Sequence, residues 1–166
     1  MSNWSDLIQM MLSLLGVGIV FILFVLSYVA TSLANVKVLK YFNHVRAWAG
    51  WIPIYAQICL TECMTEEEGK IDAFMFKFPK KFFVYWPVAV VTVNALVPYL
   101  GAMVAPLAAT FFAVVVYKDL LSQESGKEEI GLGIVCGILP IVWIVFAFIK
   151  FKGQYQPTVI ESDFEQ

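Results

Sequence analysis

Charged residues are scarce in this sequence. Only 14% of its 166 residues are Asp, Glu, Lys or Arg, against roughly 25% in soluble domains, whereas 60% are hydrophobic. The mean hydropathy is +0.78. So little charge excludes an ordinary soluble domain and predicts an integral membrane protein whose first partner is the lipid bilayer. The net charge of −2 supplies no basic field, so we expect no nucleic-acid binding.

Catalytic residue patterns are missing as well. The chain has one histidine, His44, and contains no H-E-x-x-H, no G-x-S-x-G and no phosphate-binding G-x-x-x-x-G-K-[ST]. Its cysteines, Cys59, Cys63 and Cys136, are odd in number and lie in apolar contexts, where reduced packing thiols are usual. We therefore expect no enzyme, no cofactor, no metal and no disulfide framework.

Long apolar runs are what the sequence does have. They cover residues 7–34, 47–64, 82–117 and 131–149, and the first is uncharged and longer than the roughly 20 residues that span about 30 Å of hydrocarbon. The residues before it lack the basic region of a cleavable signal, so we expect it to remain as an anchor. The prediction is an all-α helical bundle, a single membrane domain over 1–166 with about four transmembrane segments and a polar tail from 150 to 166.

The second and third runs are predicted to be broken helices. Residues 47–64 are barely enough to cross, and Pro53 removes a backbone donor, so this segment either crosses or re-enters. Residues 82–117 would form about 54 Å of helix, nearly twice the hydrocarbon thickness. Asn94 and Pro98 stand near the middle of this run, which is therefore either one long kinked helix or a hairpin. A further break is expected at Pro140, at the centre of the fourth run.

Small residues recur at helical spacing in two runs. One set is Gly101, Ala105, Ala109 and Ala113, and the other is Gly133 and Gly137. Such faces allow two helices in a membrane to approach closely, so these six residues are predicted to be packing positions.

The segment between the second and third runs is acidic first and then basic and aromatic. Lys77, Lys80, Lys81 and Trp86 are predicted to lie at the membrane interface, where lysines reach head groups and tryptophan anchors depth. A solvated loop with an aromatic anchor is the plainer interpretation, and recognition of an anionic lipid is the alternative.

Three polar features within the apolar runs could carry chemistry. Glu62 could hold a proton or a cation, although three nearby glutamates suggest that it reaches water. Cys59 and Cys63 are one helical turn apart and could bind zinc together with Glu62, but buried reduced thiols are the better interpretation. Asn94 could line a pore, although such a residue more often bonds a neighbouring helix or a freed backbone group.

The distribution of lysine and arginine does not settle the threading. If all four runs cross, these residues divide five against six between the two sides. If 47–64 only re-enters, they divide nine against two, which the positive-inside rule prefers. Length and charge therefore favour different topologies.

Two segments, VKVLKYFNHVRAWAGWIPIY and YKDLLSQESGKEEIGLGIVCGILPIVWIVFAF, resemble landmarks of a family of small bacterial multi-pass membrane proteins of unknown function, some fused to signal peptidase I. The matching positions include Trp51 to Tyr55, Lys118 to Leu120, Gly126-Lys127 and Leu139-Pro140. Ala56 and Gln57 depart from the family pattern. The resemblance implies four helices with both termini outside the cytoplasm, and it carries over no catalytic residue.

We therefore expect a non-enzymatic protein of the bacterial inner membrane that serves as a scaffold, anchor or accessory subunit. Its expected partners are other membrane subunits or further copies of itself. The alternative is a small oligomeric channel, a holin-like pore or a transporter subunit built on the broken segments around Pro53 and Asn94.

Overall fold

The chain folds almost entirely into helices. The computed structural model describes residues 4–65, 69–74 and 76–154, so the predicted tail beyond residue 154 lies outside the described residues. The helices are α1 (Trp4–Tyr41), the 3-10 helix η1 (Ala47–Trp51), α2 (Pro53–Glu62), α3 (Lys80–Leu96), α4 (Pro98–Ser125), α5 (Ile130–Ile138) and α6 (Pro140–Ile149). The mostly helical prediction is confirmed.

A bundle of four membrane spans is not confirmed. By length and composition, two helices of the described chain could cross a membrane: α1 from Asp6 to Tyr41 and α4 from Gly101 to Ser125. The run 47–64 is divided between η1 and α2, and the run 131–149 between α5 and α6. None of these pieces approaches the length that a crossing requires.

In each divided run, the second helix begins with a proline. Pro53, Pro98 and Pro140 stand in the first turn of α2, α4 and α6, where a missing N–H breaks no helical hydrogen bond. The residue before each has an extended φ, between −106° and −132°, as proline favours. Asn94 lies inside α3, three residues before its capping residue Val97. The prolines therefore reverse the chain, and Asn94 does not.

Contacts between the two ends of each divided run show that the run folds back on itself. His44, just before η1, bonds Glu62 at the end of α2, and the Nε2 to Oε2 distance is 2.8 Å. Glu129, just before α5, lies 3.5 Å from the Lys150 ammonium, just after α6. The open question about 82–117 is settled in the same way, because α3 and α4 form an antiparallel hairpin in which Gly101 packs on the backbone of Asn94.

A small sheet replaces part of the expected loop. Strands β1 (Lys70–Ala73) and β2 (Phe76–Pro79) pair antiparallel, with Ile71 opposite Phe78. Ile71 and Ala73 point into the core while their neighbours are exposed, which is the alternation of a half-buried strand. The all-α prediction is therefore wrong in this detail, because the segment between the second and third runs contains two paired strands and is not only a loop.

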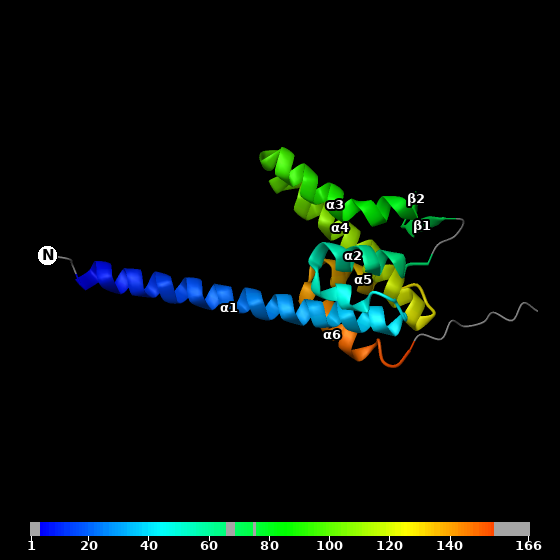
Figure 1. Ribbon diagram of the computed structural model, residues 1–166, viewed down its shortest axis with the longest axis horizontal. Coiled ribbons are helices and arrows are strands. Elements are labelled where there is room, and N and C mark those ends of the chain that lie inside the picture. The colour runs from blue at the N-terminus through cyan, green and yellow to red at the C-terminus, as the bar shows by residue number, and fades with distance from the viewer. Residues whose placement is uncertain (1–3, 66–68, 75, 155–166) are drawn as a thin grey trace, which may run out of the picture.

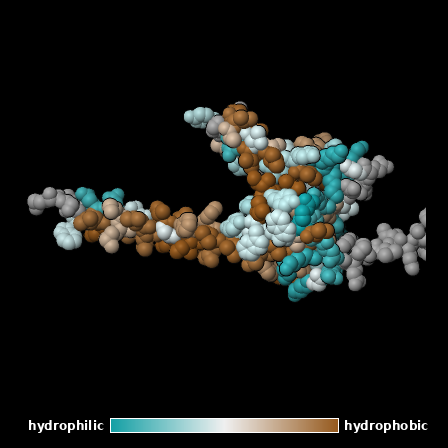
Figure 2. Space-filling model, viewed as in Figure 1, coloured by the Kyte–Doolittle hydropathy of each residue, from teal (hydrophilic) through white to brown (hydrophobic). Residues whose placement is uncertain are grey.

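The molecule has a polar end and an apolar end. Figure 1 shows α1 projecting far beyond the other elements, with the α3–α4 hairpin diverging from it on the same side. Figure 2 shows hydrophilic residues gathered at the opposite end, where the sheet and the helix connections lie. The start of α1 and the end of the described chain thus lie at opposite ends, which does not support the prediction that both termini face one side.

Buried aromatic rings join α1, α4 and α6 near the polar end. Trp143 is fully buried and stacks on Tyr117 with ring centroids 3.9 Å apart. Its indole N–H donates to Asn35 Oδ1 at 3.2 Å, so the polar atoms of this pair satisfy each other inside the core. The apolar part of α1 takes no part in this core.

Candidate functional site

A group of interacting polar side chains surrounds Glu62 at the polar end of α2. We call this group, made of His44, Arg46, Tyr55, Cys59 and Glu62, the His44 cluster. The turn after α1 brings His44 to it, because Asn43 adopts a left-handed φ of 55° and the His44 N–H bonds back to the Leu39 carbonyl at 2.9 Å. Asparagine tolerates this conformation better than most residues.

His44 and Arg46 both form hydrogen bonds with the Glu62 carboxylate. Arg46 Nη2 lies 3.1 Å from Oε2 and 3.3 Å from Oε1, while its Nη1 donates to the Tyr55 hydroxyl. The bond with Tyr55 and the charge of Glu62 both raise the pKa of Arg46. The Glu62 side chain is 32% exposed, so the expectation that it reaches water agrees with its position. Because two side chains already occupy its oxygens, this carboxylate is a poor site for a bound cation.

His44, Cys59 and Glu62 also place three possible metal ligands within 4.8 Å of one another. The hydrogen bonds argue against a metal there. The Arg46 backbone N–H donates to His44 Nδ1 at 3.2 Å, so the ring proton sits on Nε2, which donates to Glu62. A metal on Nε2 would push this proton onto Nδ1, against the Arg46 N–H.

The thiols of Cys59 and Cys63 are also poorly suited to bind a metal. Burial and the charge of Glu62 raise the pKa of Cys59, which disfavours the thiolate that a metal binds. Cys63, the second thiol of the zinc set that the sequence left as an alternative, is not part of the group of close ligands, and burial raises its pKa to about 12. The His44 cluster therefore suits a clamp that fastens the end of α2 to the turn after α1.

A second polar group lies where α4 reaches the same end. Asp119 Oδ2 accepts hydrogen bonds from the Thr65 backbone N–H at 2.9 Å and from Gln123 Nε2 at 2.8 Å. Thr65, Asp119, Asp72, Lys70 and Lys77 line a cavity of about 90 Å³. At roughly 30 Å³ for each water, this space suits a few water molecules and no organic substrate.

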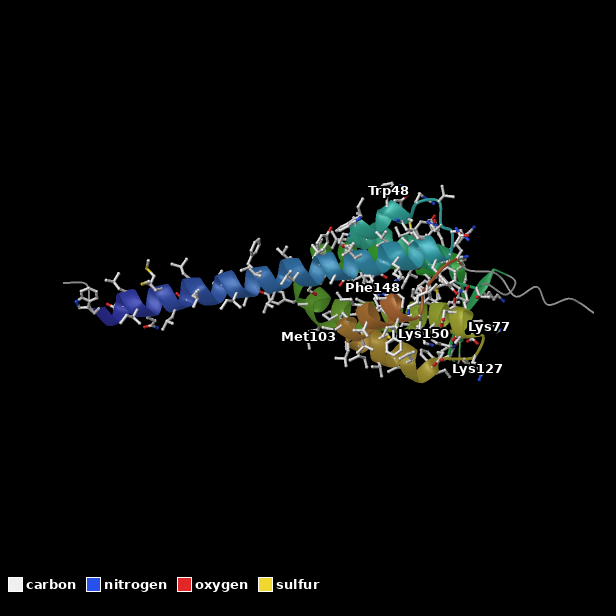
Figure 3. All side chains as sticks on the ribbon, turned by 90° about the horizontal axis from the view of Figure 1, so that it is seen from below. Trp48, Lys77, Met103, Lys127, Phe148 and Lys150 are labelled. Atoms are coloured by element: carbon white, nitrogen blue, oxygen red, sulfur yellow. The ribbon has the colours of Figure 1, made fainter. Side chains whose placement is uncertain are left out.

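Other charged side chains at this end are also paired. Lys118 Nζ lies 3.2 Å from Glu128 Oε1, and Lys150 Nζ lies 3.5 Å from both Glu124 and Glu129. Figure 3 shows Lys77, Lys127 and Lys150 together at the polar end, far from the free end of α1. These ion pairs connect the end of α4, the residues just before α5 and the residue just after α6.

The predicted packing glycines lie at a close contact between α4 and α5. A Cβ added to Gly133 would lie 2.5 Å from the Lys118 Cα, and one added to Gly137 would lie 2.7 Å from the Val114 backbone nitrogen. Of the other set, Gly101 packs on Asn94. Ala105 faces a small cavity between α3 and α4, and Ala109 and Ala113 line a larger one that also reaches α2 and α5.

The predicted interface residues separate into two kinds. Lys77 and Lys81 are exposed near the polar end. Lys80 Nζ instead donates to the carbonyl oxygens of Glu62 and Met64 at 3.1 and 3.3 Å, so it caps the end of α2. Trp86 is half-buried between α3 and α4, and its indole N–H donates to the Ala108 carbonyl at 3.3 Å. Its expected role at the membrane interface stays a prediction.

Comparison with family models, with curated proteins and with solved structures finds no match for this chain. The resemblance to the small bacterial membrane family therefore rests on its residues alone. Of the matching positions, Asp119 and Lys118 take part in the polar contacts described above, and Pro53 and Pro140 mark chain reversals.

Sequence reasoning did not find the pairing of His44 with Glu62 or of Asn35 with Trp143. The partners are 18 and 108 residues apart, and no periodic pattern links them. A weak signal existed for the first pair, because the only histidine and Arg46 stand two residues apart beside the run that ends at Glu62.

Proposed function

We propose that this chain is a non-enzymatic membrane protein that acts as a scaffold, anchor or accessory subunit of a larger membrane assembly. The observation that supports this proposal is the apolar arm of α1, residues 6–28. Every side chain in this arm whose position is described is exposed, and Gly18 alone is half-buried. An arm of this length and composition needs lipid or the helices of a partner around it.

The polar end supports a structural role. The His44 cluster uses the one histidine and Glu62 to fasten two segments together, and Asp119 holds the backbone of Thr65. Ion pairs between the hairpin ends engage Lys118 and Lys150. Groups occupied in this way are poorly placed to act as general acids or bases, which need access to a substrate.

We infer the orientation from the folding back of the chain. All eleven lysines and arginines follow residue 36, and the elements that carry them meet at the polar end. The division is then eleven against none, a stronger bias than either division obtained from the sequence alone. The positive-inside rule accordingly favours a cytoplasmic polar end and a free end of α1 outside, in a bacterial inner membrane. In this arrangement the start of α1 is outside and residue 154, the last described residue, is inside.

The pore or transporter alternative has no such support. Asn94, the polar residue expected to line a pathway, lies close to the tip of the α3–α4 hairpin against Gly101. Pro53 starts α2 and turns the chain back toward the polar end. These positions suit a hairpin better than a channel wall.

Site-specific photocrosslinking in the native host tests the proposal. A photoreactive phenylalanine analogue at Phe21 or Phe24, both on the arm, should yield a discrete protein adduct, and the same analogue at Ile141 on α6 serves as the control. An adduct of twice the mass of the chain would identify a second copy as the partner. Adducts with lipid alone from the arm would contradict a subunit role. Ion flux through liposomes that hold only the purified protein would favour the pore.

A further inference from the structure

We propose that the groove between α1 and the start of α2 binds the hydroxyl-bearing head of an uncharged lipid, of which diacylglycerol is the simplest example. The groove holds a cavity of about 320 Å³, within the range of small-molecule sites. Six of its lining residues can form side-chain hydrogen bonds: Ser27, Tyr28, Thr31, Ser32, Asn35 and Gln57. This proposal is independent of the scaffold role.

These polar side chains lie at a depth where few are expected. Ser27 precedes Lys37 by ten residues on one helix, so at 1.5 Å per residue it lies about 15 Å further from the polar end. That distance is half the thickness of the hydrocarbon layer. Polar groups at such depth usually bond each other, line a water-filled space or meet a ligand.

Some of these groups are already used within the chain. The Tyr28 hydroxyl donates to the Trp51 carbonyl, and Thr31 Oγ1 donates to the Ser27 carbonyl at 2.8 Å. The Thr31 hydroxyl oxygen still has lone pairs that can accept a hydrogen bond. The groove therefore retains acceptor capacity after its internal bonds are formed.

Gln57 supplies a polar atom without a partner. Its Oε1 is buried and has no hydrogen-bond partner among the described residues. An unpaired buried carbonyl is costly, and the few found in native proteins call for an explanation. A ligand hydroxyl in the groove would supply a partner once the Gln57 side chain turns its amide toward the cavity, and because a hydroxyl both donates and accepts, it would satisfy the amide in either orientation.

The chemistry of the lining selects an uncharged ligand. The residues that line the cavity include no Asp, Glu, Lys or Arg, so nothing there would neutralise a phosphate or an ammonium group. Pro53 and Gln57 also line the neighbouring cavity of about 410 Å³, whose other walls include Trp86, Val90 and Phe112. A polar head beside Gln57 would thus have apolar space next to it for an acyl chain.

Lipid binding to the purified full-length protein in detergent tests this inference. Native mass spectrometry and thermal unfolding should both report binding of dioleoylglycerol. The 3-acetyl ester of dioleoylglycerol, which lacks the hydroxyl proton, and dioleoyl phosphatidic acid, which is charged, should bind about tenfold more weakly or not at all. Competition by a long-chain isoprenoid alcohol would support the site and name the other source of the same hydroxyl chemistry.

Variants locate the site. Gln57→Leu and Thr31→Val should each weaken dioleoylglycerol binding, by about tenfold for the former. Thr92→Val is the matched control, because Thr92 on α3 makes the same bond to the carbonyl four residues earlier but lies away from the groove. Thr31→Val keeps the test valid if Gln57→Leu fails to fold. Equal binding of the ester, no binding of dioleoylglycerol, or wild-type binding by both groove variants would overturn the proposal.

Discussion

The contact between α4 and α5 allows a sharp test of how the apolar segments pack. In Gly133→Ala, the new Cβ would lie 2.5 Å from both the Cα and the Cβ of Lys118 and 2.8 Å from its backbone nitrogen. Carbon atoms in contact prefer about 3.5–4.0 Å, so the two helices must separate by about 1 Å. Backbone atoms cannot rotate away as a flexible side chain can, and overpacking of this kind costs about 1–3 kcal/mol.

Gly131→Ala is the matched control for this change. Gly131 is in the same helix, and a Cβ there would meet nothing within 4 Å. Both substitutions replace a glycine of α5 by alanine, so the difference between the two variants reports mainly the contact with Lys118. We expect Gly133→Ala to be about 1–3 kcal/mol less stable than Gly131→Ala in thermal or denaturant unfolding in mild detergent. Equal stability of the two variants would refute the close packing of α4 and α5.

Three further outcomes follow from the contacts at the polar end and in the core. Glu62→Gln should lower the free energy of unfolding by about 1–3 kcal/mol, because it weakens the bonds to His44 and Arg46. Glu128→Gln is the control: the Glu128 side chain is 62% exposed, so this change should alter the free energy of unfolding by about 0–1 kcal/mol. Trp143→Phe should destabilise by about 1–3 kcal/mol through the unpaired Asn35 carbonyl, with more lost to the void; wild-type stability would contradict the buried bond. The pKa of Cys63, raised from 9.0 to about 12, predicts that the thiol resists alkylation at pH 8 until the protein unfolds. The stabilisation that comes from burying the neutral Cys63 thiol should be intact below pH 9 and lost between pH 9 and about 12. Rapid alkylation of the folded protein would contradict this burial.

The positions of the helices follow from composition, but their directions do not. Long uncharged runs predict helices because a bilayer offers no other partner for backbone groups. Whether a run crosses or returns depends on what its two ends contact. For 131–149 that contact is the pair between Glu129 and Lys150, which hydropathy does not register.

Proline positions carried more information than run length. Pro53, Pro98 and Pro140 were predicted as breaks, and each stands at the start of a helix after a reversal. Pro87 and Pro106 lie inside α3 and α4 without ending them. The residue before each proline that reverses the chain has a non-helical backbone, which the sequence alone does not reveal.

The sequence contains a pattern typical of the small sheet, but the same pattern was interpreted as a segment at the membrane interface. Phe74, Phe76 and Phe78 alternate with other residues, which is the period of a strand. Beside lysines the same alternation also fits an aromatic anchor at head groups. The pairing of Ile71 with Phe78 decides for the strand, because Ile71 then becomes buried.

Polar contacts at the candidate sites were the least predictable part. The partners of Glu62 and Trp143 come from other segments, and single-sequence patterns hold no record of such contacts. From the sequence Gln57 is a departure from a family pattern, whereas among the described residues its buried side-chain carbonyl oxygen has no hydrogen-bond partner. Its importance depends on the cavities on either side of it.

The most direct test of the account is the side of the membrane on which each charged segment lies. Single cysteines would replace Trp4, Lys77, Lys127 and Gln154, all exposed, in a background without the native cysteines, and be labelled with a membrane-impermeant maleimide in intact cells and inverted vesicles. We predict that position 4 reacts only from outside and that positions 77, 127 and 154 react only from inside. Labelling of positions 77 and 127 from opposite sides, as four crossing helices require, would contradict the account.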